Sequence, residues 1–286
     1  MATRRENFNN LAIKPNGITS GGRVYFTDGT NDGISPNQHQ CEAYGYNYNN
    51  ETGVCTAFTP TSNLGNSFGN ETNKITGAGN RTGNGIANTH VIGYDNRAVG
   101  NSRNNLIVGT NNQLDFQTSN CQVFGTFAEA TASNSIVLGG NNLSTDILGE
   151  RQNITLMYGW QTTNNSTVDA YLNNTSGKYF TVPTNSVVYF QSETVAVRVG
   201  GTSGSGAVGD FKSWVERGVV KNAAGTLSIV RSRTSPAASG TTTGWSPINA
   251  VSGTNFRQTV KGANNMDIEW ASTIRITQIK TSVTLS

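Results

Sequence analysis

The middle of the chain carries an internal repeat, which limits the possible folds more than any other feature. Five short segments share one pattern, in which an apolar pair is followed by a glycine: Thr72–Gly77, Asn88–Gly93, Asn104–Gly109, Asn120–Gly125 and Asn134–Gly139. The closing glycines recur at intervals of 16, 16, 16 and 14 residues. A fixed period is typical of a solenoid, in which each repeat forms one coil and packs on the next.

Two neighbouring positions of the repeat are apolar. The first is always β-branched (Ile75, Val91, Ile107, Val123, Val137), and the second is mostly large (Thr76, Ile92, Val108, Phe124, Leu138). Adjacent residues of a strand point to opposite faces, so both faces of this short strand should be covered. A single solenoid has only one buried face. The second apolar face therefore predicts a partner, either another domain or another copy of the chain.

The remaining positions complete one coil. Each glycine allows a sharp corner after the first strand, and a second short strand is expected around Ala98, Leu114 and Ala130. A third, mixed column shares the face of the second (Lys74, His90, Leu106, Gln122, Ile136). The alternative is a run of antiparallel hairpins, which would rarely keep so regular a glycine period.

The copy Asn134–Gly139, with alternating Ala128, Ala130 and Ala132 before it, resembles the head repeat of trimeric autotransporter adhesins. This resemblance covers residues 62–149 and implies a left-handed β-roll in which three chains pack side by side. The longer copies place His90 and Gln122 where that family prefers an aliphatic residue. No signal peptide, stalk or membrane anchor is recognisable, so we expect the same kind of roll in a protein that is not an autotransporter.

Longer strand patterns separated by turn clusters follow the repeat. The expected strands are 154–161, 187–190, 195–199, 211–216, 227–232, 256–260, 266–270 and 273–279, with Trp160, Trp214, Trp245 and Trp270 as anchors of one core. Such a series predicts a β-sandwich or jelly roll. The glycine-rich stretch 200–206 is expected to be a flexible surface loop, because neither a lysine nor a helix follows it.

Four pieces of this region resemble a domain at the C-terminal ends of phage and prophage tail or fibre proteins: Gly159–Thr163, Val182–Phe190, Gly225–Val230 and Ile268–Thr277. The resemblance spans residues 151–286 and implies a structural or adhesive virion protein. It supplies no catalytic residues.

Composition excludes several other classes. The chain is rich in Asn and Thr and contains 33 Gly among 286 residues, which disfavours helical bundles and coiled coils. A net charge of +3 is too small to predict nucleic-acid binding, and no apolar run is long enough to span a membrane. Cys41, Cys55 and Cys121 are expected to be three reduced thiols, although Cys41 and Cys55 could close a short loop.

Candidate chemistry is sparse. No nucleophile elbow, HExxH or Walker motif occurs, so we predict no catalytic residue, no cofactor, no metal site and no enzyme. His90 is most simply a hydrated histidine, although three copies on a trimer axis would be able to hold an ion. A glycosidase would need paired carboxylates, for which Asp210, Glu216 and Glu269 are the candidates.

Together these patterns predict an all-β homotrimer made of a β-roll followed by a β-sandwich. Residues 1–61, polar and irregular, form the expected virion-attachment segment, residues 62–150 the trimerising roll and residues 151–286 the outer domain. The predicted function is that of a phage tail fibre or spike, made in the host cytoplasm and assembled into the virion. Its expected partners are two sister chains, other virion proteins and a host-surface glycan. The alternatives are a capsid decoration protein or head fibre, and a polysaccharide-cleaving spike.

Overall fold

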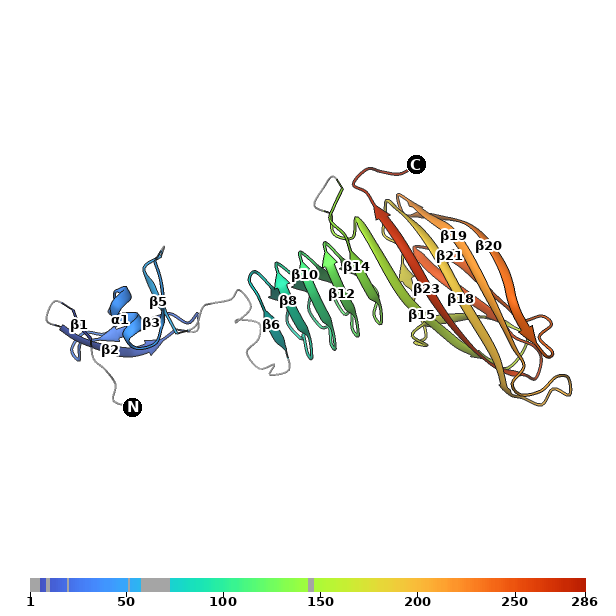
Figure 1. Cartoon of the computed structure of the whole chain (residues 1–286), viewed down its shortest axis with the longest axis horizontal. Helices are drawn as coiled ribbons and strands as arrows, with labels where there is room; N and C mark the ends of the chain where they lie inside the picture. The colour runs from blue at the N-terminus through green and yellow to red at the C-terminus, as the bar shows by residue number, and fades with distance from the viewer. Residues whose placement is uncertain (1–5, 9–10, 20, 51, 58–72, 144–146) are drawn as a thin grey trace. The chain divides into compact units, whose positions relative to one another are not determined.

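The computed structural model describes residues 6–8, 11–19, 21–50, 52–57, 73–143 and 147–286 (Figure 1). Within these residues almost every regular element is a strand, and α1 (Gln38–Ala43) is a short helix. The chain divides into two compact units, Met1–Glu71 and Thr72–Ser286. The nearly all-β fold predicted from the sequence is confirmed. The three predicted domain boundaries stay a prediction.

The repeat forms a β-solenoid. Its main parallel sheet contains β6 (Lys74–Thr76), β8 (His90–Tyr94), β10 (Leu106–Thr110), β12 (Gln122–Thr126) and β14 (Ile136–Gly139). A second parallel sheet contains β7 (Arg81–Thr82), β9 (Arg97–Ala98), β11 (Gln113–Leu114) and β13 (Glu129–Ala130). Equivalent residues of successive copies pair in register, as Gly93, Gly109 and Gly125 do. The coils therefore stack as the glycine period predicts, and the hairpin alternative is wrong.

The interior of the solenoid is narrow and apolar. The β-branched column lies inside, with Val91, Ile107, Val123 and Val137 buried. Opposite them lie Ala98, Leu114 and Ala130, also buried. On the short strands Ala98 and Ala130 are small and leave room for the β-branched side chains of the main strands, whereas Leu114 fills the middle of the interior.

A ladder of buried asparagines supports one corner of the coils. Asn112 donates from Nδ2 to Oδ1 of Asn96 at 3.0 Å and to the carbonyl oxygen of Gly125 at 2.8 Å. Its own Oδ1 accepts from the backbone N–H of Ala128 at 2.9 Å. The amide thus satisfies backbone groups that the sharp corner leaves without a strand partner.

We expect Asn112→Ala to destabilise the solenoid, because it leaves the Ala128 N–H and the Gly125 carbonyl buried without partners. The expected loss is about 2–4 kcal/mol of unfolding free energy, measured by chemical denaturation. The control is Asn104→Ala, which removes a rung of the exposed ladder formed by Asn104 and Asn120. Because water can replace an exposed hydrogen bond, this substitution should cost only about 1 kcal/mol. Equal losses for the two variants would contradict this role of the buried ladder.

The second region of this unit continues the same sheet. Beyond β14 the order is β15 (Arg151–Thr162), β23 (Asp267–Lys280), β18 (Ser186–Gly200), β19 (Phe211–Ala223) and β20 (Thr226–Ser239), all antiparallel. Val137 pairs with Ile154, so the buried row of the solenoid runs on into this region. An ion pair of 2.7 Å between Lys280 and Glu129 also ties β23 to the last coil.

Four shorter strands cover the inner face of these long strands: β16 (Thr167–Leu172), β17 (Phe180–Thr181), β21 (Ser246–Ser252) and β22 (Asn255–Lys261). Phe256 packs on Phe190 with ring centroids 5.0 Å apart, and Trp270 stacks on Trp214 at 5.6 Å. Strand β16 pairs with both β15 and β22, so the two layers are one connected sheet. The β-sandwich or jelly-roll assignment therefore stays a prediction.

Two pairs of expected strands are single long strands. The segments 187–190 and 195–199 merge in β18, and 266–270 and 273–279 merge in β23. Two of the polar residues between these segments, Thr194 and Ser272, point inward and bond to each other, with Thr194 Oγ1 and Ser272 Oγ 2.7 Å apart. Two buried hydroxyls that satisfy each other permit the strands to continue.

The N-terminal unit is folded, which corrects the prediction of an irregular segment. It contains β1 (Glu6–Phe8), β2 (Leu11–Ile18), β3 (Val24–Thr27), α1, β4 (Asn47–Asn49) and β5 (Val54–Thr56). Phe26 is fully buried and packs edge-on against Tyr44 and Tyr46. The aromatic residues that form this core lie far apart in the sequence, so the polar composition of the segment did not indicate a core.

A disulfide between Cys41 and Cys55 corrects the prediction of three reduced thiols. The helix α1 and the β4–β5 hairpin place the two Cα atoms 5.7 Å apart, within the range that a disulfide spans. Cys121 is free and buried inside the solenoid. Proximity in the fold decided the pairing, and the sequence offered no measure of it.

Replacing both Cys41 and Cys55 by serine should destabilise the N-terminal unit by about 3 kcal/mol, because an unfolded chain without the link gains loop entropy. Hydrogen exchange read residue by residue would measure this loss. Amides of β2, β3 and β5 should lose protection, whereas amides of β10 and β12 serve as the internal control. Unchanged protection in the N-terminal unit would contradict the prediction.

Candidate functional site

The most extensive candidate interaction surface is the outer face of the main solenoid sheet. The second apolar column points outward, and the chain itself leaves it open: Ile92 is 42% exposed and Leu138 57% exposed. Between them Val108 and Phe124 are half-buried in the same row. Contiguous exposed apolar residues of this kind mark interaction surfaces. We call this row, from Ile92 to Leu138, the outer stripe.

The same face continues over the antiparallel strands, which lie beside β14 in Figure 1. Met157 (57% exposed), Val195 (48%) and Ile279 (52%) point outward from β15, β18 and β23. Charged residues interrupt them, including Glu193 and Arg275. The face is thus most apolar on the last coils of the solenoid and mixed beyond β15.

His90 lies at the polar end of this face. It is exposed and aligned with Lys74 on one side and Leu106 on the other. Across the described part of the chain, no group of three or more His, Cys, Asp or Glu residues is placed to hold a metal ion. The hydrated His90 expected from the sequence stays a prediction, and an ion held by three copies stays its alternative.

The three candidate carboxylates do not form a catalytic pair. Glu216 is buried on the inner side of β19, whereas Glu269 is exposed on the outer side of β23. Asp210 lies in the loop before β19 and accepts from the backbone N–H groups of Ala207 and Thr241. These hydrogen bonds hold the pKa of Asp210 below its usual value.

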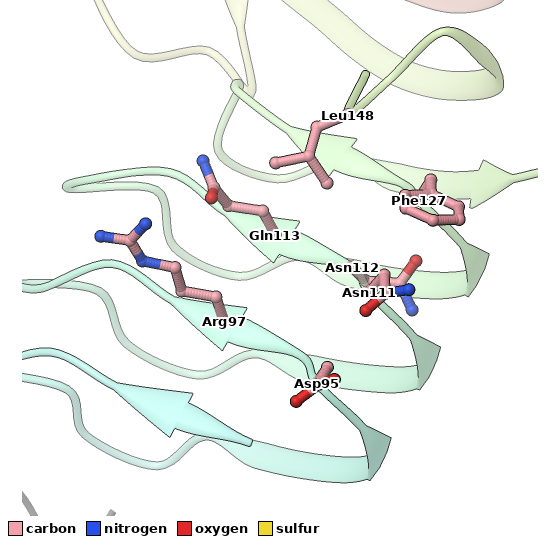
Figure 2. A pocket seen from close by; sticks show the side chains of 7 residues that line it. All are labelled: Asp95, Arg97, Asn111, Asn112, Gln113, Phe127 and Leu148. Carbon is pink, nitrogen blue, oxygen red and sulfur yellow. The ribbon is translucent and has the colours of Figure 1, made fainter. Parts of the chain in front are cut away.

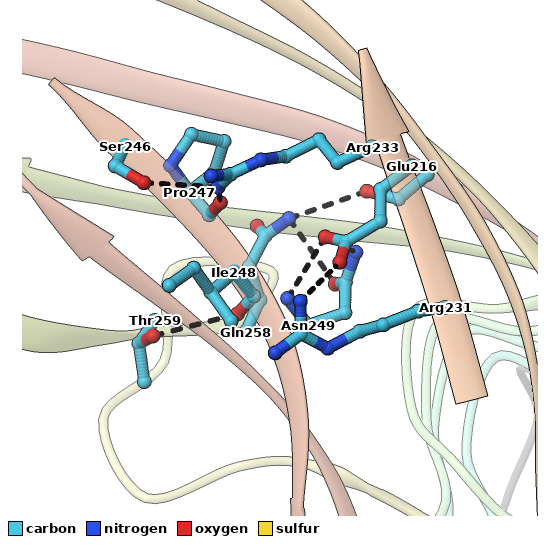
Figure 3. A network of polar contacts seen from close by, with 10 residues as sticks. Glu216, Arg231, Arg233, Ser246, Pro247, Ile248, Asn249, Gln258 and Thr259 are labelled. Atoms are coloured by element: carbon cyan, nitrogen blue, oxygen red, sulfur yellow. Dashed lines mark hydrogen bonds and ion pairs between the residues drawn. The ribbon is translucent and has the colours of Figure 1, made fainter. Parts of the chain in front are cut away.

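Glu216 belongs to a buried polar network between the two layers (Figure 3). Its Oε2 accepts from the backbone N–H and the Nδ2 of Asn249, at 3.1 and 2.9 Å. Its Oε1 pairs with Arg231 at 2.9 Å, and Gln258 continues the network to Ser192. Because both oxygens of Glu216 already have partners, the network fixes the layers in register rather than presenting a free acid or base.

The glycine-rich loop after β18 has an internal scaffold that its composition did not predict. Arg198 is buried and donates to the carbonyl oxygens of Gly200, Ser203 and Ser205. These hydrogen bonds to the guanidinium hold the loop in one conformation, which corrects the expectation of a flexible segment. The loop residues remain exposed at the surface, as expected.

A shallow groove of about 450 Å³ follows one corner of the solenoid (Figure 2). Successive coils place Asp95, Asn111 and Phe127 along one side, with Arg97 and Gln113 along the other. Leu148 lies at the end nearest the antiparallel strands. The lining combines charges, amides and one aromatic ring, and Asp95 is its single acid, so it offers no pair of carboxylates.

An aromatic cluster lies where β15 pairs with β16. Trp160 packs on Tyr171 at 4.7 Å, Tyr171 on Tyr179 at 5.5 Å, and Arg257 lies over the Tyr179 ring at 5.2 Å. Desolvation, followed by the hydrogen bond that Tyr179 donates to Asp169, raises the pKa of Tyr179 to about 12. Sequence reasoning did not single out Tyr179. The sequence feature that could have indicated it is the group of aromatic residues, Tyr171, Tyr179 and Phe180, around the polar turn 173–178.

Comparison with known proteins gives a structural likeness only. No protein-family model matches the sequence, and no curated protein matches it. The tailspike protein of Acinetobacter baumannii phage AM24 superposes with a TM-score of 0.30 and 8% identity, over 74% of this chain and 47% of that chain. The tailspike protein of Acinetobacter phage vB_ApiP_P1 gives a TM-score of 0.25 and 8% identity, over 73% and 54% of the two chains.

A third similar structure is tailspike protein gp49 from Acinetobacter baumannii bacteriophage Fri1, described as a capsular polysaccharide depolymerase. It gives a TM-score of 0.23 and 10% identity, over 72% of this chain and 38% of that chain. This neighbour contradicts our expectation of a protein without enzymatic activity, and that expectation is withdrawn. The chain spans about half the length, or less, of these tailspikes. These three structures give no support to the alternative of a capsid decoration protein or head fibre.

No helix in the described residues is long and apolar enough to cross a membrane.

Proposed function

We propose that this protein is a homotrimeric bacteriophage tail spike or fibre. In this proposal three solenoids pack through their outer stripes, residues 1–61 attach the trimer to the virion, and the region from β15 onward faces the host. A rigid trimer would present three copies of each outward site, so that weak single contacts add up to strong attachment through avidity.

The observation that carries the proposal is the outer stripe. Val108 and Phe124 link two strongly exposed residues, Ile92 and Leu138, into one apolar row on a flat parallel sheet. Water contact with this row is unfavourable by about 25 cal/mol for each Å² of apolar surface, so association of copies is favoured. The resemblance of the repeat to adhesin heads supports three copies rather than two.

Two measurements test the proposal on the full chain. Light scattering at micromolar concentration should give the mass of three chains, and a monomer would refute the trimer. Immunogold labelling of the assembled phage should place the protein on the tail. Labelling spread over the capsid would refute the tail assignment in favour of a decoration protein or head fibre.

A further inference from the structure

A second groove, of about 420 Å³, lies where the solenoid meets the antiparallel strands. We call it the junction groove. The turns of the last two coils form one wall, and the turn between β16 and β17 forms the other. Its lining includes two aromatic residues, Phe116 and Tyr179, and four polar ones, Thr131, Ser133, Asn134 and Lys178.

The junction groove exists because coil stacking stops there. An exposed ladder of side-chain amides runs up the solenoid: Asn88 donates to Asn104, Asn104 to Asn120 and Asn120 to Asn134, at 3.1, 3.1 and 3.0 Å. Asn134 is the last rung, and no further coil supplies the next acceptor. Among the described residues the Asn134 Nδ2 has no acceptor, so its two N–H donors are available to a ligand in the groove.

The aromatic side chains of the junction groove differ in how they are held. Tyr179 is fixed by a hydrogen bond of 2.7 Å to Asp169 and by Arg257 over its ring. Phe116 projects from a polar turn and is 55% exposed. An exposed phenylalanine is unfavourable in water. A ligand with an apolar surface would cover it.

From this arrangement we infer that the junction groove binds a saccharide unit of a host-surface polysaccharide. A sugar ring offers C–H groups that pack on Phe116 and hydroxyls that accept from Asn134 and Lys178 and exchange hydrogen bonds with Thr131 and Ser133. Mixed apolar and polar lining of this kind is what small-molecule sites use to fix orientation. The inference rests on the proposed function, since it names what the spike would hold.

The test uses the full-length protein and an immobilised array of bacterial capsular and lipopolysaccharide oligosaccharides. Phe116→Ala removes the exposed ring. Asn134→Asp removes the N–H donors, keeps the oxygen that accepts from Asn120, and tolerates the positive φ of 61° at this position. The control is Phe127→Ala, which removes an aromatic ring of the next coil, one that lines the 450 Å³ groove at the corner of the solenoid and not the junction groove.

We expect the wild type to bind at least one saccharide of the array, and each groove variant to weaken that binding at least about tenfold, or about 1.4 kcal/mol. The Phe127→Ala variant should bind like the wild type. The inference is overturned if the wild-type trimer binds no saccharide, if both groove variants bind normally, or if Phe127→Ala alone loses binding.

Light scattering on the same samples separates the two proposals. A wild-type monomer would refute the proposed function, whereas a trimer without saccharide binding would refute the junction groove alone. If Phe116→Ala dissociates the trimer, Phe116 is a contact between copies of the chain, and the saccharide site is likewise overturned.

Discussion

Leu138→Asp should convert the trimer into a folded monomer. Leu138 is 57% exposed in the single chain, so an aspartate there meets water and leaves the coil intact. In the trimer the same position would be buried against sister chains, and each carboxylate would lose its hydration at a cost on the order of several kcal/mol. Because the trimer would carry three such carboxylates, we expect it to dissociate.

Light scattering measures the mass and circular dichroism the strand content. Val208→Asp is the matched control, because Val208 is 68% exposed and lies in the loop before β19, away from the outer stripe. It should remain trimeric. A trimer of unchanged mass for Leu138→Asp would show that the outer stripe is not the interface.

Gly109→Ala should unfold the solenoid at a much lower temperature than the wild type. Gly109 has a φ of +130°, and a Cβ atom there would lie 1.9 Å from the carbonyl oxygen of Gly125 in the next coil. Because that oxygen belongs to stacked backbone, relief requires the two coils to separate. We expect a loss of about 4 kcal/mol or more, the range reached when a substitution forces strain into a packed core.

Gly177→Ala is the matched control for backbone conformation. Gly177 also has a positive φ, of +76°, but a Cβ atom there would meet nothing within 4 Å. Its loss should be about 1 kcal/mol, the cost of the left-handed conformation alone. Thermal unfolding of both variants therefore separates the conformational cost from the close approach of coils. Similar melting temperatures would contradict the stacking argument.

The solenoid was the part of this protein most open to prediction from sequence. Val123 and Phe124 are neighbours in the chain, so their opposite faces follow from strand geometry alone. The period of the glycines then fixes the register between coils. In the antiparallel region the same reasoning placed segments of β15, β19, β20 and β22. It missed β16, β17 and β21 and broke β18 and β23, where hydroxyls that pair inside the protein look like turn residues in the sequence.

The candidate sites were much less predictable. Asp210, Glu216 and Glu269 were singled out by residue type. The fold places Asp210 in a loop, Glu216 on the inner face of β19 and Glu269 on the outer face of β23. Phe116 and Asn134 drew no attention as ligand-binding residues. They line the junction groove because the solenoid ends beside them and the turn between β16 and β17 faces them. A local sequence pattern does not encode this proximity.

The amino-acid sequence by itself determined the all-β class, the coil period and the two apolar faces of the repeat, because each follows from local strand geometry and side-chain alternation. Tertiary structure alone decided the Cys41–Cys55 link, the continuity of the solenoid with the long antiparallel strands, and the junction groove. These depend on residues far apart in the chain, whose distances are set only when the whole chain packs.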